Sequence, residues 1–248
     1  MTSKHWYKKT AVITGASSGI GACVALKLAN AGITVIGLAR RVELIEELNN
    51  QITGEGKIHA YCCDLNDESS ILEAFKWIQE KFTTFQILIC NAGMIRANFL
   101  SESPTSDIKQ LYDLNVFATT ICLREGLRAM RSTPNLNCHI IIMNSVLGHR
   151  VPDVSMPLFS VYPASKHAIA ALCQTVRQEI QFLKLNIKLT SINPGMVDTD
   201  FLKVYATASK MPKLNTEDVA QALYYTLETP PHVQVEDVTL QSVPIHGE

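Results

Sequence analysis

Tyr162 and Lys166 stand four residues apart in the stretch VYPASKHAIAAL, where the pattern indicates a helix. Residues at i and i+4 lie on one helix face. A tyrosine hydroxyl has an ordinary pKa near ~10, which is too high for a base at neutral pH. A neighbouring ammonium group stabilises the phenolate and lowers that pKa. The spacing therefore fits a phenol that acts as an acid–base group, although a surface pair would show the same spacing.

A glycine-rich loop near the start of the chain has the chemistry of a phosphate site. Gly15, Gly19 and Gly21 follow the apolar run TAVIT and lead into a helical pattern. Glycine allows a tight turn and lets the backbone approach a pyrophosphate closely. The helix that follows offers unpaired N–H groups and the positive end of its dipole. A strand–helix turn without a ligand would look similar, but the position directly after an apolar strand favours dinucleotide binding.

Two arginines, Arg40 and Arg41, follow the second apolar run in the stretch GLARRVE. In dinucleotide sites the end of this strand faces the adenosine ribose, where an acid binds the hydroxyls of NAD and an arginine pairs with the 2′-phosphate of NADP. No acidic residue occurs there before Glu43. A solvated basic pair is the alternative, but we expect an NADP(H) site in which these arginines grip the phosphate.

Taken in order, the motifs resemble the short-chain dehydrogenase/reductase family over nearly the whole chain. The matches to the family are T-G-x-x-x-G-x-G at Thr14 to Gly21, an aspartate at Asp64, N-A-G at Asn91 to Gly93, an asparagine at Asn115, a serine at Ser145, Y-x-x-x-K at Tyr162 and Lys166, and P-G at Pro194 and Gly195. The departures are small: Cys90 replaces an asparagine of the family, and Ser145 and Tyr162 are separated by more residues than usual.

The resemblance implies a role for each matched residue. Tyr162 would exchange a proton with the substrate oxygen, Ser145 would hold that oxygen, and Lys166 would lower the tyrosine pKa and bind the nicotinamide ribose. Asn115 would hold a water that links Lys166 to solvent, and no metal is implied. The implied cofactor contacts are Gly15, Ser17, Ser18, Gly19, Ile20, Gly21, Arg40, Arg41, Asp64, Leu65, Asn91, Ala92, Gly93, Tyr162, Lys166, Pro194, Gly195, Val197 and Thr199.

The loops after the fourth, fifth and sixth strands supply the expected substrate pocket. Its residues are Met94, Leu147, Val151, Phe159, Met196 and Phe201. A mostly apolar wall favours a lipophilic alcohol or ketone over a sugar or an acid. His149 and Arg150 lie nearby, and we interpret them as loop residues rather than substrate contacts.

Two stretches, GLARRVE and SVLGHRVP, are similar to one branch of the family. That branch holds the NADP-dependent farnesol dehydrogenases of insects and related steroid or carbonyl reductases of vertebrates. An isoprenoid alcohol such as farnesol is therefore the first expected substrate, and a steroid or another bulky carbonyl is the second. A sensor that binds NADPH without turnover competes with both, but it would not need Tyr162, Lys166 and Ser145 together.

The elements that must position these residues alternate along the chain. Their continuous apolar character is typical of a parallel sheet buried on both faces. We therefore predict one domain over residues 1–248, of the α/β class: a Rossmann-type doubly wound parallel sheet of about seven strands, with helices on both faces. The apolar runs span 10–14, 33–39, 57–63, 85–90, 138–144, 186–193 and 233–240, and the main helical patterns span 19–31, 42–52, 67–82, 105–131 and 162–183.

Composition limits the remaining functions. The formal net charge of the 248 residues is −1, so no global field supports binding to nucleic acid. No apolar run reaches the ~20 residues of a membrane helix, and the polar N-terminus has no signal-peptide pattern. The seven cysteines form no CxxC pair, which favours buried, reduced thiols and a cytoplasmic protein. The resemblance also implies a homodimer or homotetramer formed through the helices near 105–131 and 162–183.

Overall fold

The computed structural model describes residues 5–133, 136–153, 158–204 and 211–243. Within them, seven parallel strands form one sheet in the order β3-β2-β1-β4-β5-β6-β7. The order reverses between β1 and β4, which is where ligands bind in open sheets of this class. The strands are β1 Thr10–Thr14, β2 Thr34–Ala39, β3 Lys57–Cys62, β4 Ile87–Cys90, β5 Cys138–Met143, β6 Ile187–Pro194 and β7 Asp237–Leu240. The predicted doubly wound sheet is confirmed.

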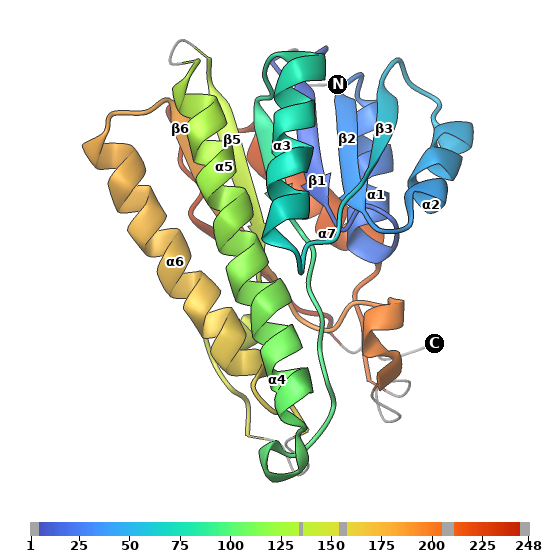
Figure 1. The fold of residues 1–248 in the computed structure, drawn as a ribbon, viewed down its shortest axis with the longest axis vertical. Helices are drawn as coiled ribbons and strands as arrows, with labels where there is room; N and C mark the ends of the chain where they lie inside the picture. The colour runs from blue at the N-terminus through green and yellow to red at the C-terminus, as the bar shows by residue number, and fades with distance from the viewer. Residues whose placement is uncertain (1–4, 134–135, 154–157, 205–210, 244–248) are drawn as a thin grey trace.

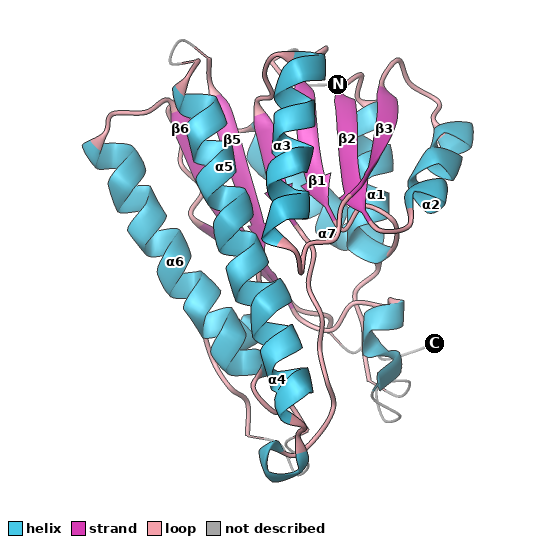
Figure 2. Ribbon diagram, viewed as in Figure 1, coloured by secondary structure: helices cyan, strands magenta, loops and turns pink. Residues whose placement is uncertain are grey.

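Helices cover both faces of the sheet (Figure 1). The helices α3, α5 and α6 lie on one face, and α1 and α7 lie on the other. Figure 2 shows the same layers coloured as helix and strand. The helices are α1 Gly19–Asn30, α2 Val42–Glu47, α3 Glu68–Phe82, α4 Thr105–Tyr112, α5 Thr119–Arg131, α6 Tyr162–Phe182 and α7 Thr216–Glu228. The helix predicted at 42–52 is α2 followed by a 3-10 turn, Leu48–Gln51.

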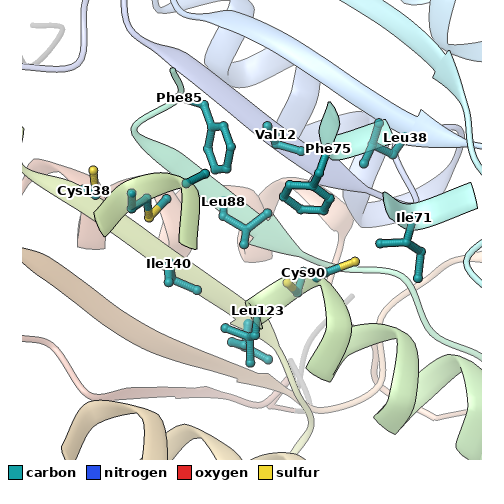
Figure 3. Close-up of a cluster of buried hydrophobic side chains, with 14 of the residues drawn as sticks. Val12, Leu38, Ile71, Phe75, Phe85, Leu88, Cys90, Leu123, Cys138 and Ile140 are labelled. Carbon is teal, nitrogen blue, oxygen red and sulfur yellow. The ribbon is translucent and has the colours of Figure 1, made fainter. Parts of the chain in front are cut away.

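Two hydrophobic cores form, one on each face of the sheet. Successive residues of a strand point to opposite faces. In β1, Val12 joins the core that contains Phe75 of α3 (Figure 3), whereas Ile13 joins the core that contains Leu28 of α1. The strands read as continuous apolar runs because both of their faces are covered in this way.

The seven cysteines all fall within the described residues, and none of them forms a disulfide. Five are buried. Burial raises the pKa of the Cys90 and Cys138 thiols to about 12, so these core residues (Figure 3) stay protonated and unreactive. Across the described part of the chain, the structure contains no helix with the length and apolar character needed to span a membrane.

The single helix predicted over 105–131 is interrupted in its middle. A π-helical turn, Asp113–Ala118, joins α4 to α5. Such turns widen the helix locally and are frequent at functional sites. Asn115 lies in this turn and is almost fully buried, at 1% exposure. The widened turn therefore directs a polar side chain into the protein, which the apolar periodicity does not reveal.

Candidate active site

A cavity of about 1550 Å³ opens at the carboxyl edge of the sheet. It extends from the end of β2, past the loops after β1 and β4, to the segments that follow β5 and β6. Most residues predicted to bind the cofactor line it: Gly15, Ser17, Ser18, Gly19, Ile20, Arg40, Arg41, Asp64, Leu65, Asn91, Ala92, Gly93, Tyr162, Lys166, Pro194, Gly195, Val197 and Thr199. Gly21 is the one predicted cofactor residue that is not in this wall.

The loop between β1 and α1 needs its glycines for two different reasons. Gly15 and Gly19 have φ angles of 69° and 55°, in the left-handed region that favours glycine. At Gly21 a Cβ atom would lie 2.2 Å from the Gly15 carbonyl oxygen, so a side chain does not fit. The Asn91 amide donates to the carbonyl oxygens of Thr14 and Gly15, at 3.1 and 3.2 Å. The loop is thus closed tightly before α1, whose first turn carries no acidic residue.

Arg41 is held against the glycine loop at the β2 end of the cavity. Its Nη2 atom donates to the hydroxyls of Ser17 and Ser18, at 3.3 and 3.2 Å. Arg40 lines the cavity beside it. Two guanidinium groups therefore stand where the loop and the second strand meet, and no acidic partner is bonded to Arg41 among the described residues.

Lys166 and Tyr162 lie together on the first turns of α6. Tyr162 is 6% exposed and Lys166 is also 6% exposed. The Lys166 ammonium donates to the Met143 carbonyl oxygen at 3.0 Å and lies 5.7 Å from the centre of the Tyr162 ring. Burial lowers the pKa of Lys166 from 10.5 to about 8. The helix begins at Tyr162 with Pro163 in its first turn, which suits a residue without an N–H.

Ser145 reaches the same cavity from the end of β5. Its side chain caps the short turn Val146–Gly148, because its Oγ atom accepts from the Leu147 N–H at 3.1 Å. That bond uses an acceptor position of the hydroxyl and leaves its O–H free to donate. Ser145, Tyr162 and Lys166 thus all line the cavity, which receives a hydroxyl, a phenol and an ammonium group from them.

Asn115 lies behind this wall rather than in it. Its amide forms a two-way pair with the Met94 backbone: Met94 N–H donates to Oδ1 at 2.8 Å, and Nδ2 donates to the Met94 carbonyl oxygen at 2.9 Å. Nδ2 also donates to Ser165 Oγ at 3.2 Å. The side chain therefore ties the loop after β4 to α6, while the predicted water relay stays a prediction.

The residues predicted for the substrate pocket lie only in part in the cavity wall. Leu147, Phe159, Met196 and Phe201 line the cavity, and the Phe201 ring meets the Tyr162 ring edge-on, with 6.0 Å between centres. Met94 and Val151 do not line it, and Val151 is 54% exposed.

Several residues outside the predicted substrate pocket also line the cavity. They include His149 and Arg150, interpreted above as loop residues, and Met211, Pro212, Gln241 and Ser242. The last four come from segments close to the C-terminus, held by a bond from Ser242 Oγ to the Pro212 carbonyl oxygen at 2.7 Å. The sequence did not show that β7 pairs with β6. This pairing places the residues after Leu240 beside Gly195 and therefore at the cavity.

Residues 9–210 match the family model for short chain dehydrogenases. The chain belongs to the short-chain dehydrogenase/reductase family. It is therefore an oxidoreductase with a nucleotide-binding fold, and the nicotinamide cofactor of the family would occupy the cavity described above.

Individual relatives of this dehydrogenase/reductase cover almost the whole chain. The farnesol dehydrogenase of Aedes aegypti is 39% identical over 242 residues, which is 96% of this chain and 98% of that protein. The dehydrogenase/reductase SDR family member 11 of Bos taurus is 39% identical over 250 residues, which is 96% of this chain and 97% of that protein. Among solved structures, an alcohol dehydrogenase of the archaeon Thermococcus sibiricus, complexed with 5-hydroxy-NADP, has a TM-score of 0.86 at 25% identity and covers 97% of this chain and 99% of that one.

The residues of this family member fit a nicotinamide dinucleotide. The backbone at Gly15 and Gly19 approaches the cavity without side chains, and α1 directs its first N–H groups at the same place. At the other end, the Tyr162 hydroxyl and the Lys166 ammonium are groups that hydrogen-bond a ribose.

Proposed function

We propose that this protein is an NADP(H)-dependent oxidoreductase that interconverts a lipophilic alcohol and its aldehyde or ketone. An isoprenoid alcohol such as farnesol is the first candidate substrate. The observation that carries the proposal is that Ser145, Tyr162 and Lys166 line the same cavity as Arg40 and Arg41.

The preference for NADP(H) rests on Arg41. An arginine already bonded to the two serines of the glycine loop loses little freedom when a phosphate arrives. The 2′-phosphate of NADP would accept two or more charge-assisted bonds there. NAD offers only ribose hydroxyls at this place, and an acid that would bind them is missing from the end of β2.

The chemistry of the chain's own residues follows from their positions. In oxidation Tyr162 takes the proton of the substrate hydroxyl, and in reduction it gives that proton to the carbonyl oxygen. Ser145 donates to the same oxygen, and Lys166 favours the phenolate by its charge. The bound cofactor supplies or accepts the hydride.

The nature of the substrate rests on the wall around Tyr162. Leu147, Phe159, Met196 and Phe201 are apolar, and Phe201 packs against the tyrosine ring itself. Such a wall favours a hydrocarbon substituent next to the reacting carbon. The similarity to the Aedes aegypti farnesol dehydrogenase supports an isoprenoid alcohol, whereas a steroid or another bulky carbonyl would use the same wall.

A homodimer or homotetramer is part of the proposal. Phe117, in the π-helical turn that leads into α5, is 60% exposed, and Phe182, at the end of α6, is 85% exposed. Large aromatic side chains at these two helices support self-association, which would remove them from water.

The test is a set of absorbance assays of the reduced nicotinamide, with NADP⁺ or NAD⁺ and a panel of farnesol, geraniol, a hydroxysteroid and a small secondary alcohol. Turnover of farnesol with NADP⁺, and little with NAD⁺, is expected. Turnover of the steroid alone keeps the mechanism and changes the substrate class. A preference for NAD⁺ contradicts the role of Arg41. Tight NADPH binding without turnover of any alcohol or carbonyl would favour a sensor.

A further inference from the structure

Asn144 is a buried polar residue that the chemistry proposed above does not use. Its side chain is 3% exposed and belongs to the cavity wall. Neither Oδ1 nor Nδ2 has a hydrogen-bond partner among the described residues. Its backbone is paired normally, since the Asn144 N–H donates to the Ile192 carbonyl oxygen at 2.8 Å. The lack of partners therefore concerns the side-chain amide alone.

A buried amide without hydrogen-bond partners lowers the stability of the folded protein, because both polar atoms lose their bonds to water and gain none in the protein. An apolar residue of the same size would fill the space without that cost. Buried unpaired groups are rare in native proteins, and each one requires an explanation. A group that destabilises the free protein is retained where it serves the site.

The location of Asn144 connects it with the catalytic wall on both sides. The residue before it is Met143, whose carbonyl oxygen accepts a hydrogen bond from the Lys166 ammonium at 3.0 Å. The residue after it is Ser145, whose Oγ caps the turn Val146–Gly148. Asn144 thus stands directly after β5, between the two residues that make these contacts.

Gly148 packs the turn directly onto this amide. A Cβ atom added at Gly148 would lie 2.6 Å from Asn144 Nδ2 and 2.7 Å from the Lys166 carbonyl oxygen. The Gly148 N–H in turn donates to the Ser145 carbonyl oxygen at 2.9 Å. The turn that holds Ser145 therefore rests on the Asn144 amide and on the α6 backbone at Lys166, and only glycine allows the three to meet.

We propose that Asn144 is a positioning residue that acts through Ser145. When cofactor and substrate occupy the cavity, the Val146–Gly148 turn shifts and the Asn144 amide forms hydrogen bonds. Those bonds keep the Ser145 hydroxyl in place to donate to the substrate oxygen. The free protein carries the unpaired amide, and the occupied protein recovers its bonds, so the amide favours the occupied arrangement. This role rests on the proposed dehydrogenase function.

The experiment compares Asn144→Leu, Ser145→Ala and the double variant with the wild-type protein in NADP(H)-dependent turnover and in thermal unfolding. Asn144→Leu should unfold at the same or a higher temperature, because the unpaired amide is gone. Its kcat should fall at least tenfold while its KM for NADP(H) changes less than threefold. The double variant should be about as slow as Ser145→Ala alone, since a residue that acts through Ser145 has no effect without it.

Thr84→Val is the matched control. Thr84 Oγ1 is also buried without a partner, but Thr84 lies before β4, at the edge of the sheet away from the cavity. Its replacement should leave kcat unchanged. If Asn144→Leu does not fold, Asn144→Ala replaces it in the same cycle.

Each outcome decides between the two proposals. A wild-type kcat in the Asn144 variant, or a double variant whose losses multiply, overturns the role of Asn144 and leaves the dehydrogenase function standing. A wild-type protein that turns over no alcohol or carbonyl overturns the proposed function, and the role of Asn144 with it.

Discussion

The Lys166 ammonium lies 5.7 Å from the centre of the Tyr162 ring, and it is fixed there by the Met143 carbonyl oxygen at 3.0 Å. The lysine is therefore anchored to the end of β5 while it stands beside the tyrosine of α6. A cation in a buried position acts on its neighbour more strongly than one in water. In the proposed function, Tyr162 and Lys166 of α6 form the acid–base unit, and Met143 at the end of β5 holds the lysine in place.

Tyr162→Phe should reduce turnover about 10²- to 10⁴-fold, because the proton donor and acceptor is lost while the ring is kept. NADPH binding, measured by its fluorescence, should change little. A variant that retains most of the activity would contradict the assignment of Tyr162. Tyr112→Phe, on α4, is the matched control and should behave like the wild-type protein.

Lys166→Met should remove turnover and stabilise the fold. Burial lowers the pKa of Lys166 from 10.5 to about 8, so the folded protein binds fewer protons at this residue than the unfolded chain between those values. The contribution of this site to stability thus rises with pH from about 8 to 10.5, and the cost of burying the charge is complete below pH 8. At pH 7 the variant should gain roughly 1–3 kcal/mol in the free energy of unfolding, and less at pH 10.

Urea unfolding at pH 7 and pH 10 measures this effect. Lys76→Met is the control, because the Lys76 side chain on α3 is 77% exposed and its removal should change little. A Lys166→Met variant that is less stable than the wild-type protein at pH 7 would show that the bond to Met143 outweighs the burial of the charge.

Arg41→Ala should raise the KM for NADP⁺ about 10- to 100-fold, which corresponds to the loss of a charge-assisted bond. The KM for NAD⁺ should stay nearly constant, since NAD has no 2′-phosphate. Arg40→Ala should have the smaller effect, because it is Arg41 whose guanidinium group donates to the Ser17 and Ser18 hydroxyls of the glycine loop. Arg131→Ala, at the end of α5, controls for the loss of a positive charge. Equal losses with both cofactors would contradict the phosphate assignment.

His139→Gln should reduce the sensitivity of the fold to acid. Burial lowers the pKa of His139 from 6.5 to about 3. Between these pH values the imidazole is protonated in the unfolded chain but neutral in the folded protein. The stability that this residue contributes is complete above pH 6.5 and is lost as the pH falls toward 3. Between pH 7 and pH 5 the wild-type protein should lose about 2 kcal/mol more than the variant. Urea unfolding at the two pH values measures the difference, and the exposed His232→Gln should show none.

The layers of the fold can be predicted from the sequence alone, and so can the main residues of the candidate site. Continuous apolar runs predict a sheet covered on both faces. Val12 and Ile13 are neighbours in β1 but pack into the cores on opposite faces, so both must be apolar. The glycine loop, the arginine pair and the Tyr162–Lys166 spacing are local patterns, so they are readable without tertiary structure. The carboxyl edge of a parallel sheet then brings them together.

Features that depend on contacts between distant segments could not be predicted from the sequence. The π-helical turn that buries Asn115 against Met94 leaves no mark on the apolar periodicity. The pairing of β7 with β6 brings Gln241 and Ser242 to the cavity wall, and the burial of the Asn144 amide without hydrogen-bond partners follows from the packing of the segments around it. Each arises from backbone segments that approach in space, and no local spacing of residues encodes which segments will meet.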